Sequence, residues 1–116
     1  MLNESLKIHV AKTFFARLIG LLGRTSLPPD EALLISRCAG VHTWFMRFAI
    51  DALWLDENNR VIGMAENLKP WKTARGPVGT VHCLELAAGG VKRQRIGMGQ
   101  VVIVTDWDRD PSLRSG

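Results

Sequence analysis

The sequence has few cysteines, no long apolar run and no export signal, and each absence excludes a class of protein. Its two cysteines are too few for a disulfide scaffold, so we expect both to be free thiols. No apolar segment approaches the roughly 20 residues of a transmembrane helix. Residues 1–10 lack the basic and then apolar pattern of a secretory signal. These absences predict a cytoplasmic protein with no membrane partner.

Internal repeats and low-complexity segments are also absent, and the pattern does not alternate strands with helices as parallel α/β folds do. With 116 residues, of which 47% are hydrophobic and 22% charged, the chain has the size and composition of one globular domain. We therefore predict a single domain over residues 1–116. Its core is expected over about 5–107, followed by a flexible polar tail over 108–116.

Alternating apolar residues predict about seven short strands. These strands are expected over 6–10, 32–36, 41–48, 51–56, 60–66, 80–86 and 100–105. Glu57-Asn58-Asn59 predicts a hairpin between two of them. Residues 67–79 carry several prolines and glycines, which indicates a long loop or an irregular edge.

One helix is predicted over about 13–22, because Thr13 can cap its N-terminus and apolar residues then recur on one helical face. A short helical turn is predicted over 91–96. The fold class is therefore mostly β (α+β). We expect an antiparallel, jelly-roll-like β-sandwich or a small barrel, with the one N-terminal helix packed against it.

The net charge of +4 comes from 15 basic and 11 acidic residues. The basic excess gathers loosely over Lys69–Arg75 and Lys92–Arg95. Such clusters are typical of a solvated surface, and they also leave contact with phosphate or nucleic acid open.

The stretch Cys38–Asp56 combines core-like apolar residues with groups that can do chemistry. Cys38 and His42 offer the ligands that zinc or copper(I) prefer, and equally the thiol and base of a nucleophile pair. In an extended chain their four-residue spacing separates the side chains by roughly 13 Å, too far to share one ion. Gly40 could fold the chain back. We expect no metal and no cofactor, with Cys38 and His42 kept as candidates.

Charged residues beside apolar segments form a second set. Asp51 precedes an apolar strand, a position typical of a turn cap, while pairing with a buried arginine or binding of a polar ligand stays open. Arg24 and Arg47 are the candidate arginines. Glu85, between two leucines, requires a basic partner if it is buried.

Trp71 is the best single candidate for contact with a ligand or partner. It lies in the basic, loop-like segment Lys69–Arg75, where an aromatic side chain has no obvious core to fill. Trp44 and Trp54 lie instead in predicted core strands. Exposed tryptophan and arginine are typical anchors of recognition surfaces.

Two motifs, in this order, are specific enough to indicate a family. They are Gly20-Leu-Leu-Gly-Arg24 and Trp44-Phe-Met-Arg-Phe-Ala-Ile-Asp51. Further matching positions are Thr13, Arg17, Leu27, Asp30, His42, Thr43, Val61, Leu84-Glu-Leu86, Gly89 and Ile96-Gly97. Over residues 12 to about 103, the chain resembles the domain of unknown function 192 family of small prokaryotic proteins.

The resemblance implies a jelly-roll-like β-sandwich with a helix near its start, and it brings no established activity. Cys38, His42 and Lys69-Pro-Trp71 look like a subgroup in which a Cys-x-x-x-His element and a Lys-Pro-Trp loop occur together. The chain departs from the family in two ways. Many relatives carry an export signal, and a Gly-Asp usually precedes the last strand, where this chain has Gly99-Gln100.

These observations predict a non-enzymatic or accessory binding domain with a shallow polar site beside Trp71. The candidate ligand-binding residues are Arg24, Cys38, His42, Arg47, Asp51 and Trp71. The expected partner is a small molecule or a protein. The alternative is a thiol- or metal-dependent enzyme that uses Cys38 and His42, and weak binding of nucleic acid or another polyanion ranks third.

Overall fold

The computed structural model describes residues 6–11, 29–38, 40–43 and 47–103, and this part of the chain forms seven strands and one short helix. Five strands form one sheet in the order β1-β2-β7-β4-β5, and β3 pairs with β6 in a two-stranded ribbon. The strands are β1 (Lys7–Ala11), β2 (Glu31–Ile35), β3 (Gly40–His42), β4 (Ile50–Leu55), β5 (Val61–Leu68), β6 (Thr73–Arg75) and β7 (His82–Ala87). The helix, α2, spans Gly90–Arg93. The chain is therefore mostly β, as predicted.

The sheet is open, with β1 at one edge and β5 at the other, so the small-barrel alternative is wrong. Its neighbours are antiparallel except for β1 and β2, which run parallel. The prediction of an all-antiparallel sheet is thus wrong for this pair. Parallel neighbours cannot be joined by a tight hairpin, and β1 and β2 are separated by residues 12–30.

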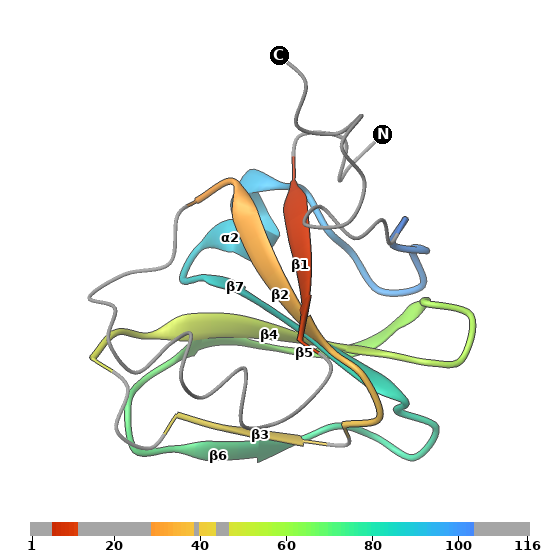
Figure 1. Cartoon of the computed structure of the whole chain (residues 1–116), viewed down its shortest axis with the longest axis horizontal. Helices are drawn as coiled ribbons and strands as arrows, with labels where there is room; N and C mark the ends of the chain where they lie inside the picture. Colours follow the sequence, from red (N-terminus) through yellow and green to blue (C-terminus); the bar gives the residue numbers. More distant parts are fainter. Residues whose placement is uncertain (1–5, 12–28, 39, 44–46, 104–116) are drawn as a thin grey trace.

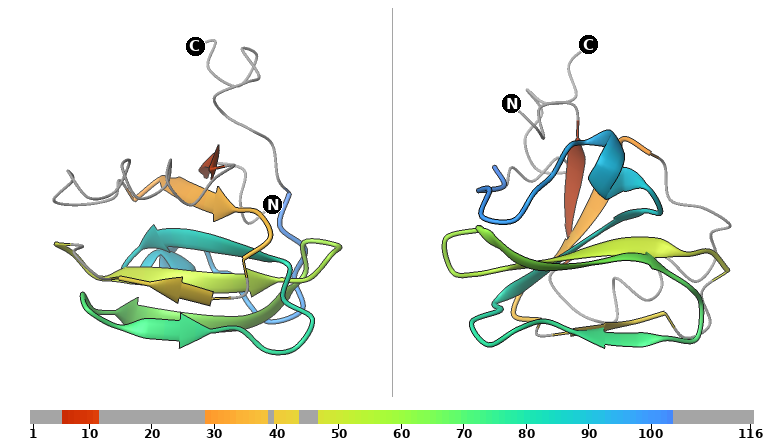
Figure 2. Two further views of the ribbon diagram at one scale, coloured as in Figure 1. Left: turned by 60° about the horizontal axis from the view of Figure 1, so that its bottom comes forward. Right: turned by 180° about the vertical axis from the view of Figure 1, so that it is seen from behind.

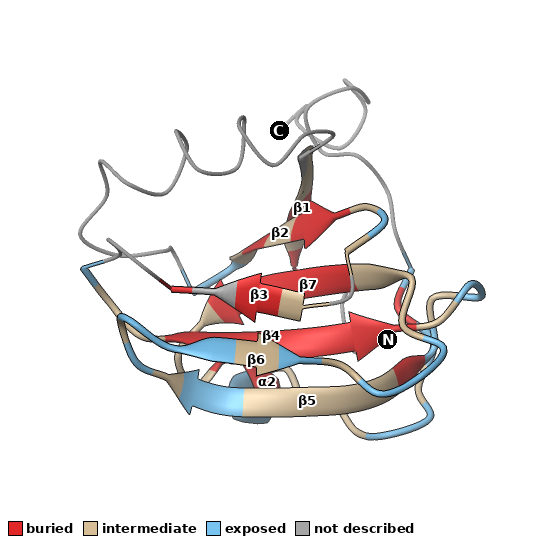
Figure 3. Cartoon of the chain, turned by 90° about the horizontal axis from the view of Figure 1, so that it is seen from below, coloured by how far each residue is buried: buried red, intermediate tan, exposed pale blue. Residues whose placement is uncertain are grey.

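Both faces of the sheet are covered, because α2 lies on one face and the ribbon on the other (Figures 1 and 2). Every residue of β4, which lies between β7 and β5, is buried (Figure 3). Leu53 and Leu55 pack on the α2 side with residues of β7, whereas Ala52 and Trp54 pack on the ribbon side. Burying such apolar side chains supplies about 1.5–3 kcal/mol each, which makes these two layers the main stabilising element.

The predicted hairpin between β4 and β5 is confirmed. Asp56 Oδ1 accepts hydrogen bonds from the backbone N–H groups of Asn58 and Arg60, both at 2.9 Å. Asn59 has a φ of 61°, a conformation that asparagine tolerates better than most residues. Asn58 and Asn59, which marked this turn in the sequence, lie in it, and the side chain of Asp56, which was not part of that signal, supplies its hydrogen bonds.

Three local predictions require correction: those for residues 67–79, for the strand from residue 100 and for the strand over 41–48. Of the two alternatives predicted for residues 67–79, a long loop or an irregular edge, the long loop is wrong, because β6 lies within them, with Ala74 turned toward the core between exposed Thr73 and Arg75. The strand predicted from residue 100 is wrong as far as residue 103. In this segment Val101 forms an isolated β-bridge with Arg60, and the side chain of Val102 is buried in the core.

The strand predicted over 41–48 ends at His42, within β3. The helix predicted over 13–22 and the tail over 108–116 lie outside the described residues. The helical turn predicted over 91–96 is present as α2, which covers four residues. Among the residues that the structure describes, no helix has the length and apolar character to cross a membrane.

Candidate functional site

Trp71 lies at the tip of a tight turn between β5 and β6. Its side chain is 60% exposed, and its backbone has a φ of 65°. Pro70 precedes it and fixes its own φ near −65°, the pairing of a type II turn in which glycine normally takes the second place. A bulky residue in this conformation is unusual, because the left-handed region costs an L-residue about 1–2 kcal/mol. The strained backbone therefore presents a large aromatic ring to solvent.

Thr43, which is fully buried, forms hydrogen bonds to the backbone of this turn. Its hydroxyl donates to the carbonyl oxygen of Lys69 (2.6 Å) and accepts from the N–H of Lys72 (2.9 Å). Its backbone N–H donates to Lys72 O, and its carbonyl oxygen accepts from the N–H of Trp71 (3.0 Å). One threonine next to β3 thus holds the backbone of residues 69–72 at both ends, which explains how the strained conformation persists.

The surface around the turn is basic. Lys69, Lys72 and Arg75 are exposed, and no acidic residue occurs between Glu66 and Glu85 in the sequence. Because Ala74 turns inward, the side chain of Arg75 points away from the core on the same face of β6 as that of Thr73. We call Lys69, Trp71, Lys72, Thr73 and Arg75 the ribbon face.

Asp51 lies on the other side of the sheet. It shares the α2 face of β4 with Leu53 and is fully buried. Its Oδ1 accepts the N–H of Asn67 (2.8 Å), and its Oδ2 accepts the N–H of Val91 (3.0 Å) in the first turn of α2. Gly89, at the N-cap of that helix, has no side chain to do this. Asp51 therefore caps α2, 40 residues further along the chain, rather than a turn beside its own strand, and it lies on the opposite face of the sheet from the ribbon face.

Cys38 is half-buried where the chain passes from β2 to β3. Its thiol donates to the carbonyl oxygen of Gly40 (2.6 Å), and its own carbonyl oxygen accepts from the thiol of buried Cys83 (3.1 Å). Neither cysteine forms a disulfide, and both pack in the apolar cluster beneath the ribbon. Gly40 pairs with Arg75, so Cys38 lies near the end of the ribbon away from Trp71.

The remaining candidates are placed only in part. His42 pairs through its backbone with Thr73, next to the turn, whereas its side chain lies outside the described part of the structure. Arg47 is exposed, and Arg24 lies outside the described residues. Trp71 and the backbone of His42 are therefore close, while Asp51 and Cys38 are elsewhere. Within the described ranges, no three histidine, cysteine, aspartate or glutamate side chains gather as metal ligands would.

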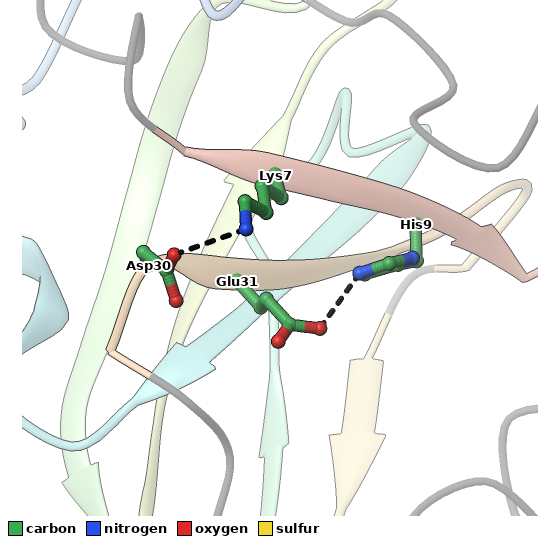
Figure 4. Close-up of polar contacts among 4 residues, drawn as sticks. All are labelled: Lys7, His9, Asp30 and Glu31. Carbon is green, nitrogen blue, oxygen red and sulfur yellow. Dashed lines mark hydrogen bonds and ion pairs between the residues drawn. The ribbon is translucent and has the colours of Figure 1, made fainter. Parts of the chain in front are cut away.

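Two polar pairs join β1 to the start of β2, and the sequence patterns did not reveal them. Lys7 Nζ lies 3.5 Å from Asp30 Oδ2, and His9 Nε2 lies 2.7 Å from Glu31 Oε1 (Figure 4). The second pair is largely shielded from solvent, the first is not. Their contact depends on the parallel register of β1 and β2, which cannot be inferred from two strands far apart in the sequence. They hold the edge of the sheet.

Two solved structures share this fold. A protein of unknown function from Novosphingobium aromaticivorans matches with a TM-score of 0.72 and 23% identity, over 81% of this chain and 71% of its own. A protein from Sinorhizobium meliloti, described as a "putative transcription regulator", matches with a TM-score of 0.69 and 25% identity, over 81% and 78%. No functionally curated protein matches the chain. The model of the domain of unknown function 192 (DUF192) family, described as "Uncharacterized ACR", matches residues 2–104. The chain therefore belongs to the DUF192 family.

Proposed function

We propose that this protein is a small, non-enzymatic binding domain whose recognition element is the turn that carries Trp71. The observation that carries the proposal is the exposed side chain of Trp71 on a backbone with positive φ. Because the side chain of Trp71 is 60% exposed, much of its apolar surface stays in water, and backbone strain of this kind is characteristic of functional positions. Tryptophan is also enriched among the residues that dominate binding energy at interfaces.

The surroundings of the turn support a binding role. Thr43 fixes the turn before any partner arrives, so binding does not have to order the backbone. Lys69 and Lys72, on either side of Trp71, add positive charge for an anionic partner. By contrast, the carboxylate of Asp51 and the thiol of Cys38 are engaged by backbone groups. We therefore place the site on the ribbon face, without Asp51.

The test compares the wild-type protein with Trp71→Ala as immobilised baits for a total cell extract. The retained material is separated into protein, nucleic acid and lipid fractions. We expect at least one fraction that the wild type retains and Trp71→Ala loses at least tenfold, with unfolding midpoints of both proteins within a few degrees. Met98→Ala, which removes an equally exposed apolar side chain outside the ribbon face, serves as the control. Equal retention by all three proteins contradicts the proposal.

Binding of nucleic acid is the second candidate function. It is favoured by the net charge of +4 and by the description of the similar Sinorhizobium meliloti protein as a "putative transcription regulator". Affinity that rests on phosphate contacts falls steeply as salt rises. Retention on a polyanion column that salt abolishes, and that Lys72→Glu weakens, is the expected result. Elution at the same salt for the wild type and Lys72→Glu would exclude this candidate.

A further inference from the structure

A second exposed apolar tip lies at the other end of β6. Val78, in the turn that follows Pro77, is fully exposed, with a relative exposure of 104%. The N–H and hydroxyl of Thr80 both donate to Pro77 O (3.2 and 2.7 Å), and Gly79 has a φ of 101°. Each end of β6 thus carries a proline-led turn held by hydrogen bonds, with an apolar side chain at its tip.

Positive charge lies between and beside the two tips. Lys72 and Arg75, between them, and Lys69, just before Trp71, are exposed, and no acidic residue occurs between Glu66 and Glu85 in the sequence. The ribbon to which β6 belongs is the outermost layer on its side of the molecule (Figures 1 and 2). An outer layer with two exposed apolar tips and several exposed basic side chains matches a partner whose surface is negatively charged and whose interior, just below that surface, is apolar.

We propose that the ribbon face, together with Val78, docks on an anionic lipid surface, in contrast to the sequence-based expectation of no membrane partner; this inference rests on the proposed binding role of Trp71. The indole ring of tryptophan prefers the boundary between headgroups and acyl chains. Lysine and arginine near an anionic leaflet each gain about 1 kcal/mol from its surface potential, which is about fivefold in affinity. Long basic side chains can keep their charge at the headgroups while their stems lie along apolar surface.

The tips favour lipid over single-stranded nucleic acid. Surfaces that bind single strands stack successive bases on several aromatic rings, whereas Trp71 is the one aromatic residue among the five described residues that define the ribbon face. Val78 has no ring to stack on a base. In a lipid surface, however, the side chains of both Trp71 and Val78 are removed from water, which is favourable for each. A single-stranded nucleic acid offers Val78 no comparable gain.

The experiment measures sedimentation of the protein with vesicles of equal parts phosphatidylcholine and phosphatidylglycerol. Vesicles of phosphatidylcholine alone and an oligothymidylate are tested in parallel. We expect the wild type to bind the mixed vesicles, with at least tenfold weaker binding to phosphatidylcholine. Trp71→Ala should weaken binding about tenfold and Val78→Ser about threefold. Lys72→Glu should weaken it at least fivefold, since it removes one favourable charge and adds an unfavourable one.

Two variants serve as matched controls. Lys92→Glu makes the same charge change on α2, across the sheet from the ribbon, and Met98→Ala removes an apolar side chain outside the ribbon face. Both should bind as the wild type does. The lipid inference is overturned if the mixed vesicles are not bound, if Trp71→Ala and Val78→Ser bind unchanged, or if Lys92→Glu weakens binding as much as Lys72→Glu.

The outcomes also separate this inference from the proposed function. If the protein does not bind the vesicles but Trp71 is still required to retain a protein or oligothymidylate, docking on lipid is refuted and the binding role of Trp71 stands. If Trp71→Ala changes neither vesicle binding nor retention from the extract, both are wrong.

Discussion

Asp51 joins three parts of the chain through its two carboxylate oxygens. It stands on β4, accepts the N–H of Asn67 at the irregular end of β5, and accepts the N–H of Val91 in α2. The pairing register of β4 with β5 shifts just beside it, between Ile50 and Ala52. A strand at a bulge and a helix at its first turn leave backbone N–H groups without a partner in their own element, and the buried carboxylate of Asp51 accepts hydrogen bonds from two such groups.

Replacing Asp51 should therefore destabilise the fold. Asp51→Ala leaves two backbone N–H groups without an acceptor, and each buried unmade bond costs about 1–3 kcal/mol, so we expect a loss of about 2–5 kcal/mol. Asp51→Asn retains one oxygen acceptor and should lose about half as much. Urea unfolding measures both free energies. A change below about 0.5 kcal/mol for Asp51→Ala would refute this structural role.

Trp71 differs from Asp51, since its backbone conformation costs stability and most of its side chain is exposed to solvent. Glycine adopts positive φ without that cost. We expect Trp71→Gly to be more stable than Trp71→Ala by about 1 kcal/mol, reduced somewhat by the greater freedom of glycine in the unfolded chain. Thermal unfolding of the two variants measures the difference. A clearly less stable Trp71→Gly would show that residue 71 is not held in the left-handed region in solution.

At the scale of elements, turns decide which strands can pair. The β4–β5 hairpin depends on Asp56, whose side chain takes the N–H groups of Asn58 and Arg60. The hydrogen bond from Arg60, that from Asn58 and the charge of Arg60 together hold the pKa of Asp56 below its ordinary value of 3.8, against a smaller upward effect of burial. The ionised carboxylate is therefore the form that stabilises the hairpin.

This sets the pH dependence of the hairpin. Because the folded pKa is depressed, the contribution of Asp56 is fully present above about pH 3.8 and is lost as the pH falls through the lower folded pKa. We expect Asp56→Ala to melt at a lower temperature than the wild type at pH 7. The gap should narrow as the pH falls below 3.8. A gap of constant size from pH 7 to pH 2 would show that the charge of Asp56 has no part in it.

At the scale of the whole molecule, the close approach of the two layers depends on Gly76, directly after β6. A methyl group added there would collide with the ring of Trp54 on the sheet and with the hydroxyl of Thr80. The ring belongs to the buried cluster between ribbon and sheet, so it cannot move aside without disturbing that cluster. Gly76 therefore lets the second layer lie directly on the first.

Gly76→Ala should destabilise the protein by about 1–3 kcal/mol, the usual range for overpacking a well-filled core. Gly97→Ala is the matched control, since its methyl group would meet Gln100 only at ordinary contact distance, 3.9 Å. Chemical denaturation of both variants measures the effect. Equal stability of the two would mean that the ribbon does not pack against Trp54 as described.

The sequence alone determined the local and short-range features of this protein. Alternation and short apolar runs located the strands of the sheet. A strand with one buried face carries apolar residues at every second position, and a strand with two buried faces carries a continuous apolar run. Glu57-Asn58-Asn59 marked its turn because asparagine favours turn conformations. The Lys69-Pro-Trp71 segment stood out because an aromatic residue lacked a core to fill. The motifs around Gly20–Arg24 and Trp44–Asp51 indicated the family that the match over residues 2–104 then established.

Only the tertiary structure decided which distant groups meet. The parallel register of β1 with β2, the bond from Val91 to Asp51 and the hydroxyl of Thr43 beneath Trp71 each join residues more than 20 positions apart. Such contacts depend on how strands order themselves in the sheet, and alternation fixes the face of a side chain but not its neighbour. For this reason the sequence grouped Asp51 with Trp71 as one candidate site, whereas the sheet places them on opposite faces.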